Sequence, residues 1–229
     1  MYDILLAAYG RQAWWPAQTS FEVVLGAYLT QNTAWRGVER SLENLRAAKA
    51  LTIEGLRMVS VAELQRLIRP SGFPVRKSTA LKAFVEMLDL EFSGSLETLA
   101  RLATPTLRSR LLKLPGVGPE TADAILLYAL GHSLPMADEY LRRIAERHRL
   151  LNPPPLRTTG GYNALIQLTT HAFEADLPAD RAQLFNEFHA LTVAVGKAHC
   201  GRIARCAGCP LAADLTLNGV ELPHPAIRK

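Results

Sequence analysis

Apolar residues recur every three to four positions along most of the chain, which is the spacing of helices that bury one face. Helices are therefore predicted over 21–29, 35–47, 61–68, 78–88, 96–103 and 106–113, and again over 139–148, 162–175 and 181–195. Ser20 is the expected N-cap of the first helix, and Asn32 or Thr33 that of the second, because short polar side chains accept hydrogen bonds from free N–H groups there. No segment alternates with a period of two for long enough to predict a strand. The sequence predicts an all-α fold.

Short segments rich in proline, glycine and serine separate these helices. They lie at 70–74, 93–95 and 104–105, and the clearest linker is 152–155, which reads Asn-Pro-Pro-Pro. The segment 10–16 contains two adjacent tryptophans, Trp14 and Trp15, which cannot both face one side of a helix. We expect a loop there, either a lid over the core or the edge of a pocket. The stretch 222–229 is expected to be a poorly ordered tail.

Residues 114–123 are the most informative segment and read Leu-Pro-Gly-Val-Gly-Pro-Glu-Thr-Ala-Asp. Pro115 and Gly116 are expected to end one helix. Gly118 is expected to allow a left-handed turn, and Pro119 to occupy the first turn of the next helix. Glycines at a helix N-terminus let backbone N–H groups approach an anion, so a phosphate is the natural ligand. The segment predicts a helix-hairpin-helix that holds a DNA backbone, with an ordinary αα-corner as the alternative.

Composition narrows the class of protein. The 229 residues are 48% hydrophobic, which allows one large domain or two small ones, and the net charge of +5 with a pI of about 9.3 suits a polyanionic partner. No apolar run reaches the ~18 residues of a membrane span, and no basic segment precedes the apolar N-terminal residues as in a signal peptide. The three cysteines lie between 200 and 209, which favours a metal or cluster site in a reducing compartment over disulfides. We expect a cytoplasmic protein, and a monomer because no heptad pattern offers a dimer seam.

Four features together resemble the helix-hairpin-helix-Gly/Pro-Asp superfamily of DNA glycosylases, and the endonuclease III family within it. They are the turn with Gln31, the hairpin at 114–122, Asp138 one helix later, and the cysteine loop at 200–209. The resemblance implies base excision repair of damaged double-stranded DNA, bound in a cleft between two lobes. One lobe is expected to be a six-helix barrel over 18–133 that contains the hairpin, and the other to combine 1–17 with 134–229.

The resemblance also implies roles for single residues. Gln31 would fill the duplex where a base has been extruded, and base flipping is required because the glycosidic bond is buried in the stack. Asp138 would stabilise the sugar cation and orient or deprotonate the attacking water. A helix N-cap is the structural alternative for Asp138, and the two roles are compatible. The remaining DNA contacts are expected from Gly116, Val117, Gly118, Thr121, Phe73 and Lys197. Arg76 and Lys77 either touch phosphates or are solvated surface charges.

Two departures from the endonuclease III pattern indicate the chemistry and the substrate. Glu120 stands where the bifunctional enzymes carry a lysine, and a carboxylate cannot form a Schiff base with the sugar, so a monofunctional glycosylase is expected. Trp14, Trp15 and Trp35 resemble the branch that excises 3-methyladenine. Aromatic faces and a nearby carboxylate attract a cationic alkylated base, so these tryptophans are the predicted base pocket. The alternatives are a mismatch uracil or thymine glycosylase, an endonuclease III-like enzyme for oxidised pyrimidines, and a non-catalytic DNA-binding module.

The cysteine loop resembles the 4Fe–4S loop of the family but is incomplete. Cys200, Cys206 and Cys209 supply three ligands, and the fourth cysteine, expected near Leu215, is absent from the sequence. Three thiolates with a fourth ligand from His199, Asp214 or a small molecule would hold a 4Fe–4S cluster or zinc. A metal-free loop is the alternative, and either role is structural.

Overall fold

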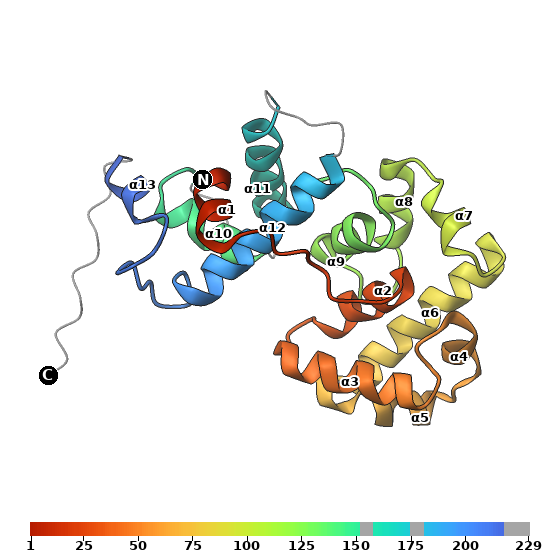
Figure 1. Ribbon diagram of the computed structural model, residues 1–229. Coiled ribbons are helices and arrows are strands. Elements are labelled where there is room, and N and C mark those ends of the chain that lie inside the picture. The colour runs from red at the N-terminus through yellow and green to blue at the C-terminus, as the bar shows by residue number, and fades with distance from the viewer. Residues whose placement is uncertain (152–157, 175–180, 218–229) are drawn as a thin grey trace, which may run out of the picture. The chain divides into compact units, whose positions relative to one another are not determined.

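The structure is a computed structural model that describes residues 1–151, 158–174 and 181–217. Helices supply its regular elements (Figure 1). The β pairing within those ranges is one isolated bridge between Cys200 and Ala204. The prediction of an all-α fold is confirmed. The expected linker at 152–155 and the expected tail at 222–229 lie outside the described residues. Among the helices that the structure describes, none has the length and apolar character needed to cross a membrane.

The chain divides into two compact units. The first, the terminal unit, combines Met1–Trp14 with Ser133–Lys229, and the second is Trp15–His132. The second of these, the middle unit, contains a succession of mostly short helices. They are α2 (Ser20–Leu29), α3 (Trp35–Ala47), α4 (Ile53–Met58), α5 (Val61–Leu67), the 3₁₀ turn η1 (Arg69–Ser71), α6 (Pro74–Phe92), α7 (Leu96–Ala100), α8 (Thr104–Leu111), α9 (Pro119–Ala124) and the π-helical turn η2 (Ile125–Ala129).

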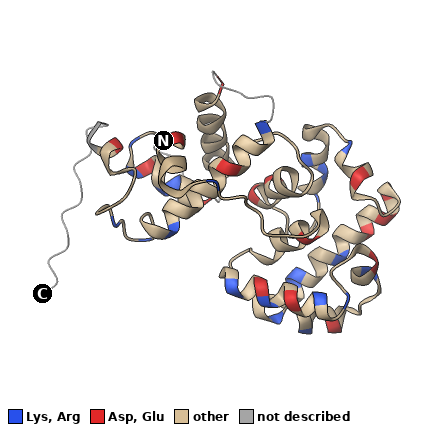
Figure 2. Cartoon of the chain, in the orientation of Figure 1, with Lys and Arg blue, Asp and Glu red and all other residues tan. Residues whose placement is uncertain are grey.

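Helix α2 is the core of the middle unit. Residues 21–29 are all buried, and the helix packs against α3, α6, α9 and η2. A helix buried along its whole length has to be covered on every side, which explains why several helices surround it. Figure 2 shows charges of both signs along α3, on the outside of this unit. The mixed charges on α3 therefore do not identify it as a DNA-binding face.

The terminal unit contains α1 (Tyr2–Tyr9), α10 (Glu139–Arg147), α11 (Thr159–Ala172), α12 (Arg181–Ala198) and α13 (Ala212–Leu217). Helix α12 packs against both α1 and α10. Two apolar clusters hold these helices together. The first is built around Leu5, Ile144 and Leu191, and the second around Leu141 and Leu165.

Several local expectations were wrong. The N-cap of α2 is Thr19, one residue before Ser20, and its side chain accepts the Glu22 N–H. The N-cap of α3 is Ala34, whose side chain cannot accept a hydrogen bond, and the hydroxyl of Thr33 donates to the Ser71 carbonyl instead of capping the helix. Helix α6 begins at Pro74, where proline lacks the N–H that a first helical turn cannot satisfy. Helices α1, α4 and α13 were not predicted.

Candidate functional site

The hairpin between α8 and α9 is present, but its left-handed turn lies at Gly116 and not at Gly118. Gly116 adopts the left-handed conformation, with φ of +76°, whereas Gly118 is extended, with φ of −98°. The expectation for Gly118 was therefore wrong. The tight turn forms at Gly116, where the Val117 N–H bonds back to the Leu114 carbonyl at 3.2 Å. Gly118 is exposed and nothing lies within 4 Å of where its Cβ would stand, so an anion can approach the N-terminus of α9, which begins at Pro119.

Gln31 is bonded to this hairpin. Its Nε2 donates to the carbonyl of Gly116 and to Oγ1 of Thr121, each at 2.9 Å. Thr121 is buried in α9. Two predicted DNA-contacting segments far apart in the sequence are thus joined through one amide, which no pattern of hydrophobic positions could indicate.

Lys77 is buried and ties together two turns of the middle unit. Its ammonium donates to the carbonyls of Leu29 and Ser71, at 2.8 and 2.6 Å, and to the Thr33 hydroxyl at 2.8 Å. The expectation that Lys77 touches phosphates or is solvated was wrong, because its side chain is used inside the protein. Burial lowers the pKa of Lys77 to about 8, with a smaller contribution from the positive charge of Arg76.

Phe73 is an exposed aromatic residue beside one of these turns. It precedes α6 in the left-handed conformation, with φ of +49°, and 60% of its surface is accessible. Val75 next to it is 63% accessible. An exposed apolar tip on a rigid turn is suited to contact with bases, and the site prediction for Phe73 stays a prediction.

Two of the predicted base-pocket tryptophans, Trp15 and Trp35, lie in the middle unit. The rings of Trp15 and Trp35 meet edge to face with centroids 5.6 Å apart. The ring of Tyr128, in η2, also meets Trp15 edge to face, with centroids 5.5 Å apart. Trp15 packs over Gly26, where an added Cβ would lie 3.0 Å from the indole ring. Tyr128 was missed because it belongs to a run of apolar residues that suggested only core packing.

Trp14 belongs to the terminal unit. Its ring lies beneath the ammonium of Lys197 on α12, with Nζ 5.3 Å from the ring centroid. This cation–π contact gives Lys197 a partner within the protein. The contact of Lys197 with DNA remains a prediction.

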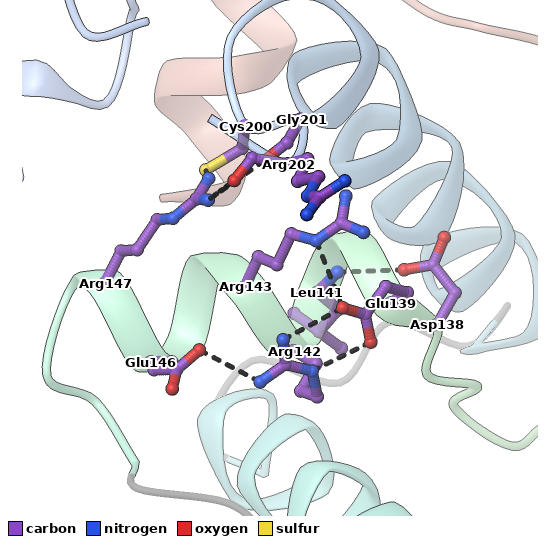
Figure 3. Close-up of polar contacts among 10 residues, drawn as sticks. All are labelled: Asp138, Glu139, Leu141, Arg142, Arg143, Glu146, Arg147, Cys200, Gly201 and Arg202. Carbon is purple, nitrogen blue, oxygen red and sulfur yellow. Dashed lines mark hydrogen bonds and ion pairs between the residues drawn. The ribbon is translucent and has the colours of Figure 1, made fainter. Parts of the chain in front are cut away.

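Asp138 stands at the start of α10 as its N-cap. Its Oδ1 accepts the Leu141 N–H at 2.8 Å, and the residue is 8% accessible (Figure 3). Its Oδ2 lies 3.8 Å from Nε2 of His189, a buried histidine on α12. The positive end of the helix dipole favours a carboxylate at this position. His189 was grouped in the sequence with the scattered histidines, and no spacing pointed to it.

The arginines that follow Asp138 are paired on α10. Arg142 bonds to Glu139 at 2.8 Å and to Glu146 at 2.9 Å, and Arg143 bonds to Glu139 at 3.1 Å (Figure 3). The hydrogen bond from Arg142 holds the pKa of Glu139 below its ordinary value. The basic charge of α10 is thus largely offset by its own acidic residues.

Arg147 at the end of α10 organises the cysteine loop. Its guanidinium donates to Sγ of Cys200 at 3.2 Å and to the carbonyls of Gly201 and Arg202 at 2.9 and 3.1 Å (Figure 3). The guanidinium thus links the end of α10 to the loop through one sulfur and two backbone acceptors.

The loop does not fit a four-ligand metal or cluster site. No three His, Cys, Asp or Glu side chains in the described ranges are grouped to hold a metal ion. Nδ1 of His199 is bonded to the Arg205 carbonyl at 2.9 Å, which fixes the orientation of the ring. Burial raises the pKa of the Cys206 and Cys209 thiols, and the neighbouring Cys200 raises both further.

Comparison with known proteins agrees with this geometry. The model of the HhH-GPD superfamily of base excision DNA repair proteins matches residues 25–159. A protein of Methanocaldococcus jannaschii whose name assigns it to the DNA repair glycosylases is 39% identical over 213 residues, which are 92% of each chain.

Two solved structures are similar in fold. The 3-methyladenine DNA glycosylase of Helicobacter pylori, bound to 1,N6-ethenoadenine, matches with a TM-score of 0.73 at 27% identity, over 86% of this chain and 97% of that one. A trapped endonuclease III–DNA covalent intermediate matches with a TM-score of 0.71 at 20% identity, over 93% and 91% of the two chains. The chain belongs to the HhH-GPD superfamily of base excision DNA repair proteins and is a DNA N-glycosylase.

Proposed function

We propose that this DNA glycosylase removes alkylated purines, 3-methyladenine above all, by hydrolysis, and that it does not cleave the strand through a lysine. The observation that carries the proposal is the buried carboxylate of Asp138. Its Oδ1 is anchored by the Leu141 N–H, so the carboxylate has a fixed orientation and its charge is supported by the N-terminus of α10.

In the proposed reaction the bond from C1′ of the deoxyribose to N9 of the purine breaks, and the base leaves with the bonding electrons. Asp138 stabilises the positive charge that develops on the sugar. Water adds its oxygen to C1′, and its proton passes to the carboxylate or through it to solvent. An N3-methylated adenine is already cationic and leaves as a neutral base, so no acid needs to protonate it.

Glu120 supports the monofunctional part of the proposal. It is exposed in the first turn of α9, two residues after Gly118, and a carboxylate there supplies no amine for a Schiff base. It also adds attraction for a cationic base. Its structural alternative is compensation of the helix dipole, which any acidic residue in a first turn provides.

The aromatic residues support the substrate class. Trp15 meets both Trp35 and Tyr128 edge to face in the middle unit, and the relative that binds 1,N6-ethenoadenine is named for 3-methyladenine. Aromatic faces attract cationic bases through terms of ~0.5–2 kcal/mol each. We infer that Trp15 and Trp35, together with Trp14, select a flipped alkylated base from DNA.

The deciding experiment incubates the purified protein with methylated duplex DNA and scores released bases separately from strand cuts. We expect release of 3-methyladenine without cuts, and loss of release in Asp138→Asn. Glu146→Gln is the matched control, because Glu146 is an exposed carboxylate of the same helix, paired with Arg142. Strand cuts at thymine glycol with no release of alkylated bases would instead establish an endonuclease III-like enzyme.

Further variants separate the parts of the proposal. Full alkyladenine release by Glu120→Lys would refute the electrostatic role of Glu120 and leave the role of Asp138 intact. Excision from uracil or thymine mispairs in preference to alkylated bases would replace the substrate class. DNA binding with no excision on any substrate would reduce the protein to a binding module.

A further inference from the structure

His189 faces the carboxylate on which the proposed reaction depends. Nε2 of His189 lies 3.8 Å from Oδ2 of Asp138, and the two side chains are only 8% and 12% accessible. The distance exceeds a hydrogen bond by about 1 Å, so the ring acts on the carboxylate through its dipole or charge, and a small rotation brings the N–H into bonding range. The contact joins two helices, α12 and α10.

Helix packing holds this pair in place. The backbone of α12 passes so close to α10 at Gly196 that an added Cβ would stand 2.3 Å from the ring of Tyr140. Tyr140 is two residues after Asp138. The spacing between the helices is therefore fixed near the carboxylate, and His189 cannot move away from it without disturbing that contact.

The carboxylate has two polar partners in the described part of the chain. Oδ1 is satisfied by the Leu141 N–H, and Oδ2 faces the His189 ring. A buried carboxylate with one fixed oxygen can still rotate or be displaced by water unless the second oxygen also has a partner. The arginines of α10 do not fill that role, since Arg142 and Arg143 are bonded to Glu139.

We propose that His189 is a positioning residue for the glycosylase reaction, which holds Oδ2 of Asp138 in the orientation that meets the sugar and the attacking water. The inference rests on the proposed catalytic role of Asp138. It assigns His189 no contact with DNA, so its loss affects the chemical step and not binding.

The test compares His189→Phe and His189→Gln with the wild type under single-turnover conditions on methylated duplex DNA. We expect Phe to lower the rate constant of base release by about 10- to 100-fold, the range for a misplaced reacting group. Kd for the same DNA, measured by fluorescence anisotropy, is expected to stay within about twofold. Gln places an N–H near the position of Nε2 and is expected to recover much of the rate.

His148 supplies the matched control, because it is also a buried histidine of the terminal unit, at the C-terminal end of α10. His148→Phe is expected to lower Tm without the rate loss. A wild-type rate in His189→Phe, or equal rate losses in both Phe variants that follow Tm, overturns the positioning role. A normal rate in Asp138→Asn overturns the catalytic role as well, whereas loss of activity there with no effect of the His189 variants overturns the positioning role alone.

Discussion

Replacement of Lys77 by methionine is expected to destabilise the middle unit by about 2 kcal/mol at pH 7. Methionine fills the space of the aliphatic stem but donates no hydrogen bond. The Leu29 carbonyl then loses its bond from the ammonium, which for a buried acceptor costs about 1–3 kcal/mol. Ser71 and Thr33 lose less, because the Thr33 hydroxyl still donates to the Ser71 carbonyl. Part of this loss is offset, because the methionine variant does not have to bury a charged ammonium.

The pH dependence of this difference has a definite sign. The pKa of Lys77 falls from 10.5 in the unfolded chain to about 8 in the folded protein. Between these values the unfolded chain holds a proton that the folded protein has released, so rising pH favours the folded state of the wild type. Methionine has no such term. From pH 7 to pH 10 the stability advantage of the wild type over the variant should therefore grow by roughly 2 kcal/mol.

The assay is urea unfolding of both proteins, followed by circular dichroism between pH 7 and pH 10. Only the difference between the proteins is interpreted, because other groups titrate equally in both. Lys77→Arg is the control that keeps a cation and tests whether the site accepts a larger donor. A variant as stable as the wild type at pH 7, with a difference that does not change up to pH 10, would refute the reasoning.

Glycines provide the remaining predictions. Gly116→Ala should lower stability by about 1–2 kcal/mol, since φ is +76° and the new Cβ would stand 3.3 Å from Cβ of Ala80. Gly118→Ala should leave stability within about 0.5 kcal/mol and weaken DNA binding, because its Cβ meets open space where a phosphate would approach; denaturation and anisotropy titrations of the two variants separate the effects. Gly196→Ala should cost about 3 kcal/mol or prevent folding of the terminal unit, as its Cβ would overlap the Tyr140 ring, and a wild-type Tm would contradict this.

The sequence was most informative where function depends on local backbone geometry. The proline and glycine pattern of the hairpin predicts the end of one helix and the start of α9 at Pro119. Asp138 before a polar helical start predicts an N-cap, which the structure contains. These features depend on neighbours in the chain, so spacing and residue type are sufficient to find them.

Contacts between distant segments could not be predicted in this way. Nothing near Gln31 indicates that its amide bonds to Gly116, 85 residues later. The burial of Lys77 was missed for the same reason, because its three acceptors come from two other turns. His189 lies among apolar positions of α12 and becomes notable only when α10 is placed beside it. Tertiary packing decides these roles, and residue periodicity carries no information on it.

The same contacts change which groups are available to DNA. The polar side chains of Gln31 and Lys77, both plausible DNA ligands from residue type alone, are bonded within the middle unit. Their bonds join the turn after α2, the turn before α6 and the hairpin. The groups left exposed on these segments include the backbone at Gly118 and the ring of Phe73. Binding that relies on backbone amides and an apolar ring requires those segments to be held rigidly, because neither group can reach outward as a long charged side chain does. The internal bonds of Gln31 and Lys77 are therefore as important to the proposed interface as a direct contact, and a variant such as Lys77→Met should weaken DNA binding although the lysine itself does not face solvent.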